Sequence, residues 1–127
     1  MLEILLKNLK EAIEADKQKE SLGLTPAEKV KEMLKSGNAI FVDVRPPNKV
    51  VGKTAPEAGI PNSYYLPVTE FADRCQEVFP QDKNAVIILG CAKIKFANRV
   101  MGYLEAFGYK NVYVLDEEIE KFIENFQ

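Results

Sequence analysis

Two residues of this chain stand where chemistry is expected, Cys91 and Arg45. Cys91 comes two positions after the apolar run Ala85–Leu89, and Arg45 directly follows the run Ala39–Val44. Both runs are short, apolar and typical of buried strands. In open α/β sheets, ligand sites lie beyond the carboxyl ends of the strands. The spacing therefore predicts that Cys91 and Arg45 lie at the ligand-binding edge of a sheet.

The surroundings of Cys91 predict a reactive thiolate. The cysteine precedes a predicted helix, so backbone N–H groups and the positive end of that helix would lie near its sulfur. Lys93 and Lys95 add two cations to the same segment. A free cysteine has a pKa of about 8.5, which helix N-termini and cations lower. We therefore expect Cys91 to be a stabilised nucleophile that is exposed enough to meet a substrate.

A plainer interpretation stays open for each of these side chains. Cys91 could be an inert buried thiol at the end of a strand. Lys93 and Lys95 could be ordinary solvated charges. Arg45 could be the structural ion-pair partner of a carboxylate instead of a substrate contact. Burial and hydrogen bonding in the folded chain distinguish these alternatives.

The composition excludes several classes of chemistry and of partner. The chain has 127 residues and no histidine, so catalytic triads, Cys–His pairs and HExxH zinc sites are excluded. Two cysteines are too few for a four-cysteine zinc site, and we expect no metal and no cofactor. A net charge of −2 predicts no nucleic-acid partner. No apolar stretch approaches the roughly twenty residues that span a bilayer, so we expect no membrane association and a cytoplasmic location.

Short apolar runs alternate with helical patterns along the chain. The predicted strands are Ala39–Val44, Tyr64–Leu66, Ala85–Leu89 and Val112–Leu115. The predicted helices run from Met1 to about Lys19, from a Thr25 cap to Gly37, from a Thr69 cap to Phe79, from Phe96 to Phe107, and onward from an Asp116 cap. Such alternation predicts an α/β fold, an open parallel sheet with helices on both faces. We place an N-terminal amphipathic helix at residues 1–20 and one α/β domain at residues 21–127.

The apolar faces of these helices predict the core and one interface. The residues expected to be buried are Val30, Met33 and Leu34; Phe71, Cys75 and Val78; Ala97, Val100, Met101, Leu104 and Phe107; and Ile119, Phe122, Ile123 and Phe126. The first helix carries a stripe of its own, formed by Leu2, Leu5, Leu6 and Leu9. An isolated helix of this length is marginal in water, so the stripe must be covered. The cover is either the rest of this chain or a second copy, and we predict a two-fold homodimer through the N-terminal helix.

Several segments occur in an order that resembles a known family. They are Leu24-Thr-Pro, Phe41-Val-Asp-Val-Arg45, Ala58-Gly-Ile-Pro-Asn-Ser63, the strand, cysteine, loop and helix around Cys91, and Phe107-Gly-Tyr-Lys-Asn-Val-Tyr113. Together they resemble the single-domain rhodaneses, sulfurtransferases that carry sulfane sulfur as a cysteine persulfide. The resemblance extends from about Leu24 to Phe126. It implies a five-stranded parallel sheet with flanking helices.

The resemblance also implies roles for individual residues. Cys91 would carry the persulfide, and the loop from Cys91 to Phe96 would surround the transferred sulfur with its amides. The substrate-binding residues would then be Ala92, Lys93, Ile94, Lys95, Phe96 and Arg45. Asp43 and Arg45 match a pair at the end of a strand that looks mainly structural in the family.

The chain departs from the family at four places. Ile94 stands where many members have glycine, Phe96 where arginine is common, Gly59 where histidine is usual, and Asp116-Glu-Glu where Glu-Gly-Gly is common. Thiosulfate is a dianion that favours fixed positive charge, so the missing arginine favours polysulfide or a protein persulfide as donor.

The resulting hypothesis is a sulfurtransferase that moves sulfur from polysulfide or thiosulfate, through Cys91, to a thiol or cyanide acceptor. The alternative is a non-catalytic rhodanese-like binding or regulatory module. A phosphatase or arsenate reductase of the Cys-x5-Arg type is disfavoured, because the sixth residue after Cys91 is Ala97 and Arg99 lies two positions further on.

Overall fold

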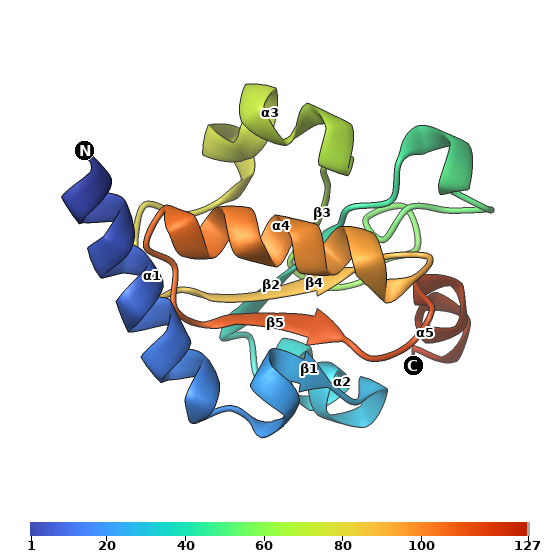
Figure 1. Ribbon diagram of the computed structural model, residues 1–127. Coiled ribbons are helices and arrows are strands. Elements are labelled where there is room, and N and C mark those ends of the chain that lie inside the picture. Colours follow the sequence, from blue (N-terminus) through green and yellow to red (C-terminus); the bar gives the residue numbers. More distant parts are fainter. Residues whose placement is uncertain (127) are drawn as a thin grey trace.

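The computed structural model describes residues 1–126 and contains one parallel sheet between two layers of helices (Figure 1). The strands are β1 (Leu24–Thr25), β2 (Ala39–Asp43), β3 (Ser63–Tyr65), β4 (Val86–Gly90) and β5 (Val112–Leu115). Their order across the sheet is β1-β5-β4-β2-β3. The helices are α1 (Leu2–Lys17), α2 (Ala27–Lys35), α3 (Phe71–Val78), α4 (Ile94–Ala106) and α5 (Ile119–Asn125). The α/β class with an open parallel five-stranded sheet is therefore confirmed.

The central strands β2 and β4 run side by side and end together. Their register pairs Phe41 with Ile88 and Asp43 with Gly90. Both strands are apolar on both faces because each face is covered by helices. Parallel strands that end at the same level bring the residues that follow them to one edge of the sheet, and these residues are Val44 and Cys91.

Each face of the sheet has its own core. On one face, α3 and α4 pack through Phe71, Ala97, Val100 and Leu104. On the other face, α2 and α5 contribute the residues Val30, Leu34, Ile119 and Phe122. In this second core the ring of Phe122 stacks on that of Phe41, with their centroids 5.4 Å apart. The two cores hold β4 and the start of α4 rigidly, which is what a site at their junction requires.

Several local predictions were wrong at the ends of elements. Thr25 does not cap a helix: it lies in the short strand β1 beside β5, and its hydroxyl donates to the carbonyl of Gly23. Helices α2, α3 and α5 begin after Pro26, Glu70 and Glu118, with no side-chain cap on any of them. The pairing of β1 with β5 is a long-range contact that no local motif signals. This pairing places Thr25 in the sheet, opposite Leu115.

The predicted core faces are correct at most positions and wrong at one. Phe107 ends α4 with its ring 53% exposed, although the helical period places it on the buried face. The ring instead stacks on Phe71 at the edge of the core. Met33, Cys75, Ile123 and Phe126 are half-buried and pack against the two cores.

Helix α1 lies along one side of the molecule and packs against α4 (Figure 1). Two polar contacts hold the helix on α4 and on the loop that follows α4. The side-chain amide of Asn8 donates to the carbonyl of Ala106 at 2.9 Å, and Glu11 pairs with Lys110 at 3.7 Å. Ala12 is the one residue of α1 that is buried. The stripe expected to need a partner, Leu2, Leu5, Leu6 and Leu9, is exposed within this chain.

A pair of carboxyl groups joins the last turns of α1 and α4. Glu105 on α4 lies against Asp16 on α1, and Lys19 binds Asp16 at 2.8 Å. Burial, the hydrogen bond to Asp16 and the charge of Asp16 raise the pKa of Glu105 to about 8, against the opposing charge of Lys19. Glu105 Oε2 is buried and has no hydrogen-bond partner within residues 1–126. Because its pKa is raised, Glu105 keeps a proton near neutral pH and can share it with Asp16 in a hydrogen bond. This proton makes the contact between the two carboxyl groups favourable.

This carboxyl pair predicts that the chain loses stability as the pH rises. The folded chain keeps a proton on Glu105 that the unfolded chain releases, so the stabilisation is complete below the ordinary glutamate pKa and is lost as pH rises to about 8. Glu105→Gln, which resembles the protonated form, should flatten this slope. Because Glu105 is partly exposed, we expect the gain at pH 8 to be only about 1 kcal/mol. Urea unfolding at several pH values measures it.

The exposed residue Glu32 provides the control. Glu32→Gln should leave the pH slope unchanged. A slope that survives Glu105→Gln would show that another group binds the proton.

Candidate functional site

Cys91 leaves the carboxyl end of β4 at a point where the backbone runs close to an aromatic ring. A Cβ atom on the preceding residue, Gly90, would lie 2.5 Å from the ring of Phe41, so no larger residue fits there without displacing the ring. The backbone on either side of the cysteine is held by hydrogen bonds. Val44 N–H donates to the carbonyl of Gly90, and Ile119 N–H donates to the carbonyl of Cys91, both at 3.0 Å. The position of the sulfur is therefore fixed by the neighbouring strand β2 and by the start of α5 on one face of the sheet.

The loop after Cys91 is shorter than the resemblance implied. Helix α4 already begins at Ile94, so only Ala92 and Lys93 separate the cysteine from it. The backbone N–H groups of Lys93 and Ala92 both donate to the sulfur of Cys91. Ile94, Lys95 and Phe96 form the first turn of the helix. The absence of glycine from this segment lets the helix begin early.

Cys91 is more deeply buried than expected, and its pKa is shifted the opposite way. The residue is only 2% exposed and belongs to the core under α3 and α4. Burial raises the pKa of the thiol above its usual value, and the N–H donors of Lys93 and Ala92 reduce this shift without cancelling it. Exposure and an already stabilised thiolate were therefore the wrong expectations. Desolvation of the sulfur outweighs two hydrogen bonds.

The charges that act on this thiol are not the lysines of the loop. Asp43 raises the pKa of Cys91 and Arg45 lowers it. Lys93 and Lys95 are exposed, and Lys95 Nζ lies 5.0 Å from the centre of the Phe96 ring. Their charges face solvent, as the plainer interpretation of the lysines predicted.

Arg45 is an internal anchor. Its side chain is completely buried. Nε and Nη2 donate to the two carboxylate oxygens of Asp43 at 3.0 and 2.7 Å. Nη1 donates to Glu120 at 3.0 Å, and Nη2 also donates to the carbonyl of Lys53 at 2.9 Å. Burial alone would lower the pKa of Arg45, but Asp43 and Glu120 raise it above its usual value, so the guanidinium stays charged. The structure places Arg45 in a buried ion pair, and substrate binding by Arg45 stays a prediction.

The partners of Arg45 include residues that the sequence did not reveal. Glu120 lies 75 positions away on α5, and no local pattern connects it to β2. The hydroxyl of Tyr65 donates to the carbonyl of Arg45 at 3.0 Å. The amide of Ala55 donates to Asp43 at 3.1 Å, which fixes the long loop after β2. These contacts join β2, β3, the loop and α5 beside Cys91.

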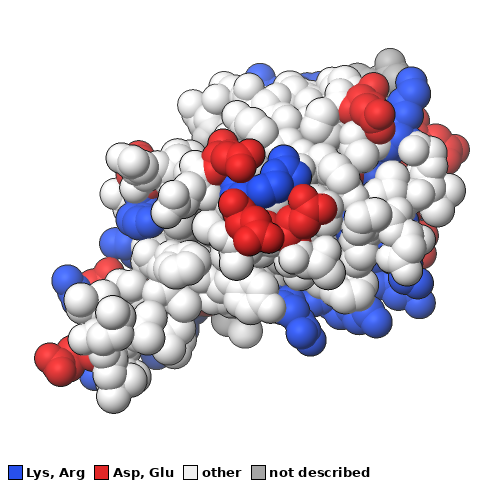
Figure 2. Space-filling view, turned by 90° about the horizontal axis from the view of Figure 1, so that it is seen from above, with Lys and Arg blue, Asp and Glu red and all other residues white. Residues whose placement is uncertain are grey.

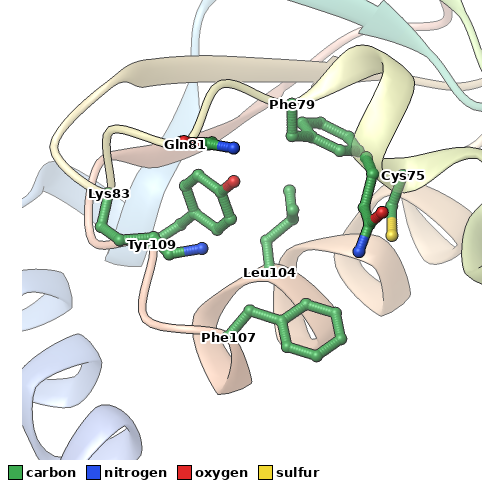
Figure 3. A pocket seen from close by; sticks show the side chains of 8 residues that line it. Cys75, Phe79, Gln81, Lys83, Leu104, Phe107 and Tyr109 are labelled. Carbon is green, nitrogen blue, oxygen red and sulfur yellow. The ribbon is translucent and has the colours of Figure 1, made fainter.

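Cys75, the second cysteine, lies in a different place. It is half-buried on α3 and lines a cavity of about 590 Å³ near the last turns of α4, together with Phe79, Leu104 and Tyr109. Figure 3 shows Cys75 and Tyr109 on opposite sides of this cavity, with Leu104 between them. Cys91 precedes the first turn of the same 13-residue helix, which is about 20 Å long. A disulfide between the two cysteines is therefore excluded in this fold.

Figure 2 shows how the charged side chains are distributed on one face of the molecule. Most of this face is uncharged, and where charges gather near its centre, acidic and basic groups lie side by side. On α3, for example, Arg74 pairs with Glu70 and Glu77. Within residues 1–126, no helix is both long and apolar enough to cross a membrane. The same residues form no group of three or more His, Cys, Asp or Glu side chains that could hold a metal ion.

Comparisons with known proteins identify relatives of this fold. The family model of the Rhodanese-like domain matches residues 26–125. The human single-domain sulfurtransferase TSTD1 is 16% identical, with a TM-score of 0.64 over 83% of this chain and 98% of that one. A rhodanese-related protein of Thermoplasma volcanium is 19% identical, with a TM-score of 0.57 over 80% and 90% of the two chains.

A longer protein also contains this fold. CoADR-RHD of Bacillus anthracis is 25% identical over 78% of this chain, which corresponds to 16% of that protein, with a TM-score of 0.54. No curated protein sequence matches the chain significantly.

The buried arginine predicts a large loss of stability when its charge is removed. Arg45→Met leaves the carboxylate of Asp43 buried without its cation, which should reduce the free energy of unfolding by about 3 to 5 kcal/mol. Arg74→Met removes the exposed pairs with Glu70 and Glu77 and should cost no more than about 1 kcal/mol. Urea unfolding of both variants measures the difference. Equal losses would contradict the anchoring role of Arg45.

Proposed function

The chain belongs to the rhodanese-like domain family, and from this premise we propose that it is a sulfurtransferase. Cys91 accepts one sulfane sulfur atom from a small donor and passes it, as a persulfide, to a thiol or cyanide. The human relative is named a single-domain sulfurtransferase, and we transfer that activity to this chain as part of the proposal. The two free cysteines suit the reducing cytoplasm, where we expect the protein to act.

One observation supports this function above all others. The sulfur of Cys91 lies at the carboxyl end of β4 and accepts hydrogen bonds from two consecutive backbone amides, those of Ala92 and Lys93. Such donors stabilise a thiolate or a persulfide anion without any side-chain cation. Because Gly90 and the helices fix the backbone, the donors are already in place before a substrate arrives.

The Cys91 thiol first releases its proton to solvent, and its raised pKa makes the thiolate the minor form at neutral pH. The Cys91 thiolate attacks the outer sulfane sulfur of the donor, so a bond forms between Sγ and that sulfur. The adjacent S–S bond of the donor breaks, and its electron pair leaves with the shortened donor. An acceptor thiolate or cyanide then attacks the outer sulfur of the Cys91 persulfide, and the electron pair of the broken S–S bond returns to Sγ. No net oxidant or reductant is consumed.

The environment of the first turn of α4 favours a polysulfide or a protein persulfide as donor. At the position where the family commonly has arginine, Phe96 is half-buried and packs against the core with Ile94. The buried Arg45 is already bound by Asp43 and Glu120 and cannot take the place of the missing cation. Only exposed lysines and the two amides remain to attract a dianion such as thiosulfate.

A non-catalytic binding or regulatory module is the second candidate. The 2% exposure of Cys91 and the raised pKa of its thiol favour it, because both reduce the fraction of accessible thiolate. The two candidates differ in whether Cys91 takes up sulfur.

Sulfur loading should depend on Cys91 and not on Cys75. After treatment with polysulfide, intact mass spectrometry should show an added mass of about 32 Da per sulfur on the wild-type chain. Cys91→Ser should abolish it with the fold intact, because the hydroxyl lacks the nucleophilicity of the thiolate. Cys75→Ser is the matched control and should load normally. A wild-type chain that takes up no sulfur would favour the binding module, and loss of loading in the Cys75 variant would make the second cysteine catalytic.

Donor preference should follow the missing arginine. We expect kcat/KM for polysulfide to exceed that for thiosulfate by about tenfold or more, because thiosulfate is a compact dianion that meets only solvent-screened lysines, whereas a polysulfide carries its charges at the two ends of an apolar sulfur chain. Lys93→Ala combined with Lys95→Ala should lower the thiosulfate rate further, whereas Phe96→Arg should raise it. A higher value for thiosulfate in the wild-type chain, or no response to the lysine changes, would contradict this account of the loop.

A further inference from the structure

The exposed apolar surface of this chain is concentrated on α1. Within residues 1–126, twelve large apolar residues are exposed, and seven of these lie between Met1 and Ile13. Four of the seven share one narrow side of the helix: Leu2, Leu6, Leu9 and Ile13. At 100° per residue they fall within about 60° of the helix circumference. We call these four residues the apolar stripe; it includes Ile13 and leaves out Leu5, which lies on the flank nearer α4.

The apolar stripe lies beside the face of α1 that packs on α4, not within it. The docked face carries Asn8 and Ala12, and Asn8 is bonded to Ala106 of α4. The stripe residues are 39% to 66% exposed. Such a contiguous apolar face on a helix already fixed by polar contacts is typical of an interaction site.

The charges around the apolar stripe argue against a lipid surface. Residues 2–17 carry four acidic groups, Glu3, Glu11, Glu14 and Asp16, and three lysines, Lys7, Lys10 and Lys17. A helix that lies on an anionic membrane is usually rich in lysine and arginine on its polar face. The mixed acidic and basic groups of α1 can instead form ion pairs with a protein partner that also carries both kinds of charge.

We propose that α1 pairs antiparallel with α1 of a second copy of this chain, with the two apolar stripes packed together. The stripe is self-complementary: when Leu6 faces Leu9 of the second copy, Leu2 faces its Ile13. Glu3 and Lys10 lie on the same flank of the stripe, away from α4. In this register Glu3 of one copy and Lys10 of the other are offset by only about 3 Å along the helix axis, so their charges can pair. The two-fold axis generates a second, identical pair.

Parallel pairing of the two helices would not bring Glu3 close to Lys10 of the second copy. It would place the flank with Glu3 and Lys10 against the opposite flank of the second copy, where Leu5 and Ala12 lie. In the antiparallel pair, the two-fold axis crosses α1 between Lys7 and Asn8. This point lies toward the amino end of the helix, which projects from the molecule in Figure 1. The two domains are thereby displaced in opposite directions along the helix pair.

The interface is near the lower limit for specific association. A buried aliphatic side chain removes on the order of 100 Å² from water, so the stripe and its neighbours from two copies bury about 1,000 Å². We therefore expect a reversible dimer with a dissociation constant on the order of micromolar. The inference concerns assembly and does not depend on sulfur transfer.

Sedimentation velocity of the full chain over a range of concentrations tests the pairing. The wild-type chain should change from monomer to dimer as its concentration passes through the micromolar range. Leu6→Lys combined with Leu9→Lys should weaken the dimer at least about a hundredfold. Ile4→Lys is the matched control, because Ile4 is 61% exposed on the far side of the helix, and it should leave the dimer unchanged. Near-ultraviolet circular dichroism verifies that each variant is folded.

Charge reversal tests the register even if the leucine variant does not fold. Glu3→Lys or Lys10→Glu alone should weaken the dimer by about two- to tenfold, and the two together should restore it. The proposal is overturned by a wild-type chain that stays monomeric at every concentration, by a dimer that tolerates the Leu6 and Leu9 changes, or by a double reversal that restores nothing. Binding of a monomeric chain to phosphatidylcholine vesicles would identify a lipid surface as the occupant instead.

Discussion

The buried ion pair between Arg45 and Asp43 is the interaction on which the arrangement of the site depends. Its side chains are completely buried, and the planar guanidinium binds both carboxylate oxygens of Asp43 together with Glu120 and a loop carbonyl. Removing two charges from water is costly, so the pair is favourable only because nearly every hydrogen-bonding group finds a partner. This requirement draws the end of β2, the loop that follows it and α5 together at one point beside Cys91.

The same arrangement explains why Cys91 is both well positioned and difficult to ionise. Strand β4, the ring of Phe41 against Gly90 and the early start of α4 hold the sulfur at the junction of the two cores. That position gives it two amide donors but removes it from water, and for the free thiol desolvation is the larger effect. In the proposed function, a persulfide would move charge to an outer sulfur atom, farther from the buried Sγ and closer to solvent.

Helix α1 is attached by a different kind of interaction. It is held by an amide hydrogen bond and a carboxyl pair to α4 and by an ion pair to Lys110 in the loop after α4, whereas most of its large apolar side chains remain exposed. Polar contacts specify orientation more than they stabilise. The helix is thus oriented on the domain with its apolar stripe available for a further contact, which we infer to be a second copy.

Residue types and apolar periodicity were enough to predict the strands β2, β4 and β5, the order of the helices, the position of Cys91 after β4 and the absence of histidine chemistry, because these are local properties. Four features became visible only in the folded chain: Thr25 belongs to a strand, Glu120 completes the environment of Arg45, Phe107 is exposed, and the pKa of Cys91 is raised. Each of these depends on residues distant in the chain, since pairing, burial and desolvation are set by what packs nearby in space. The helical period can identify an apolar face, but it cannot tell whether that face meets the core, a second chain or water.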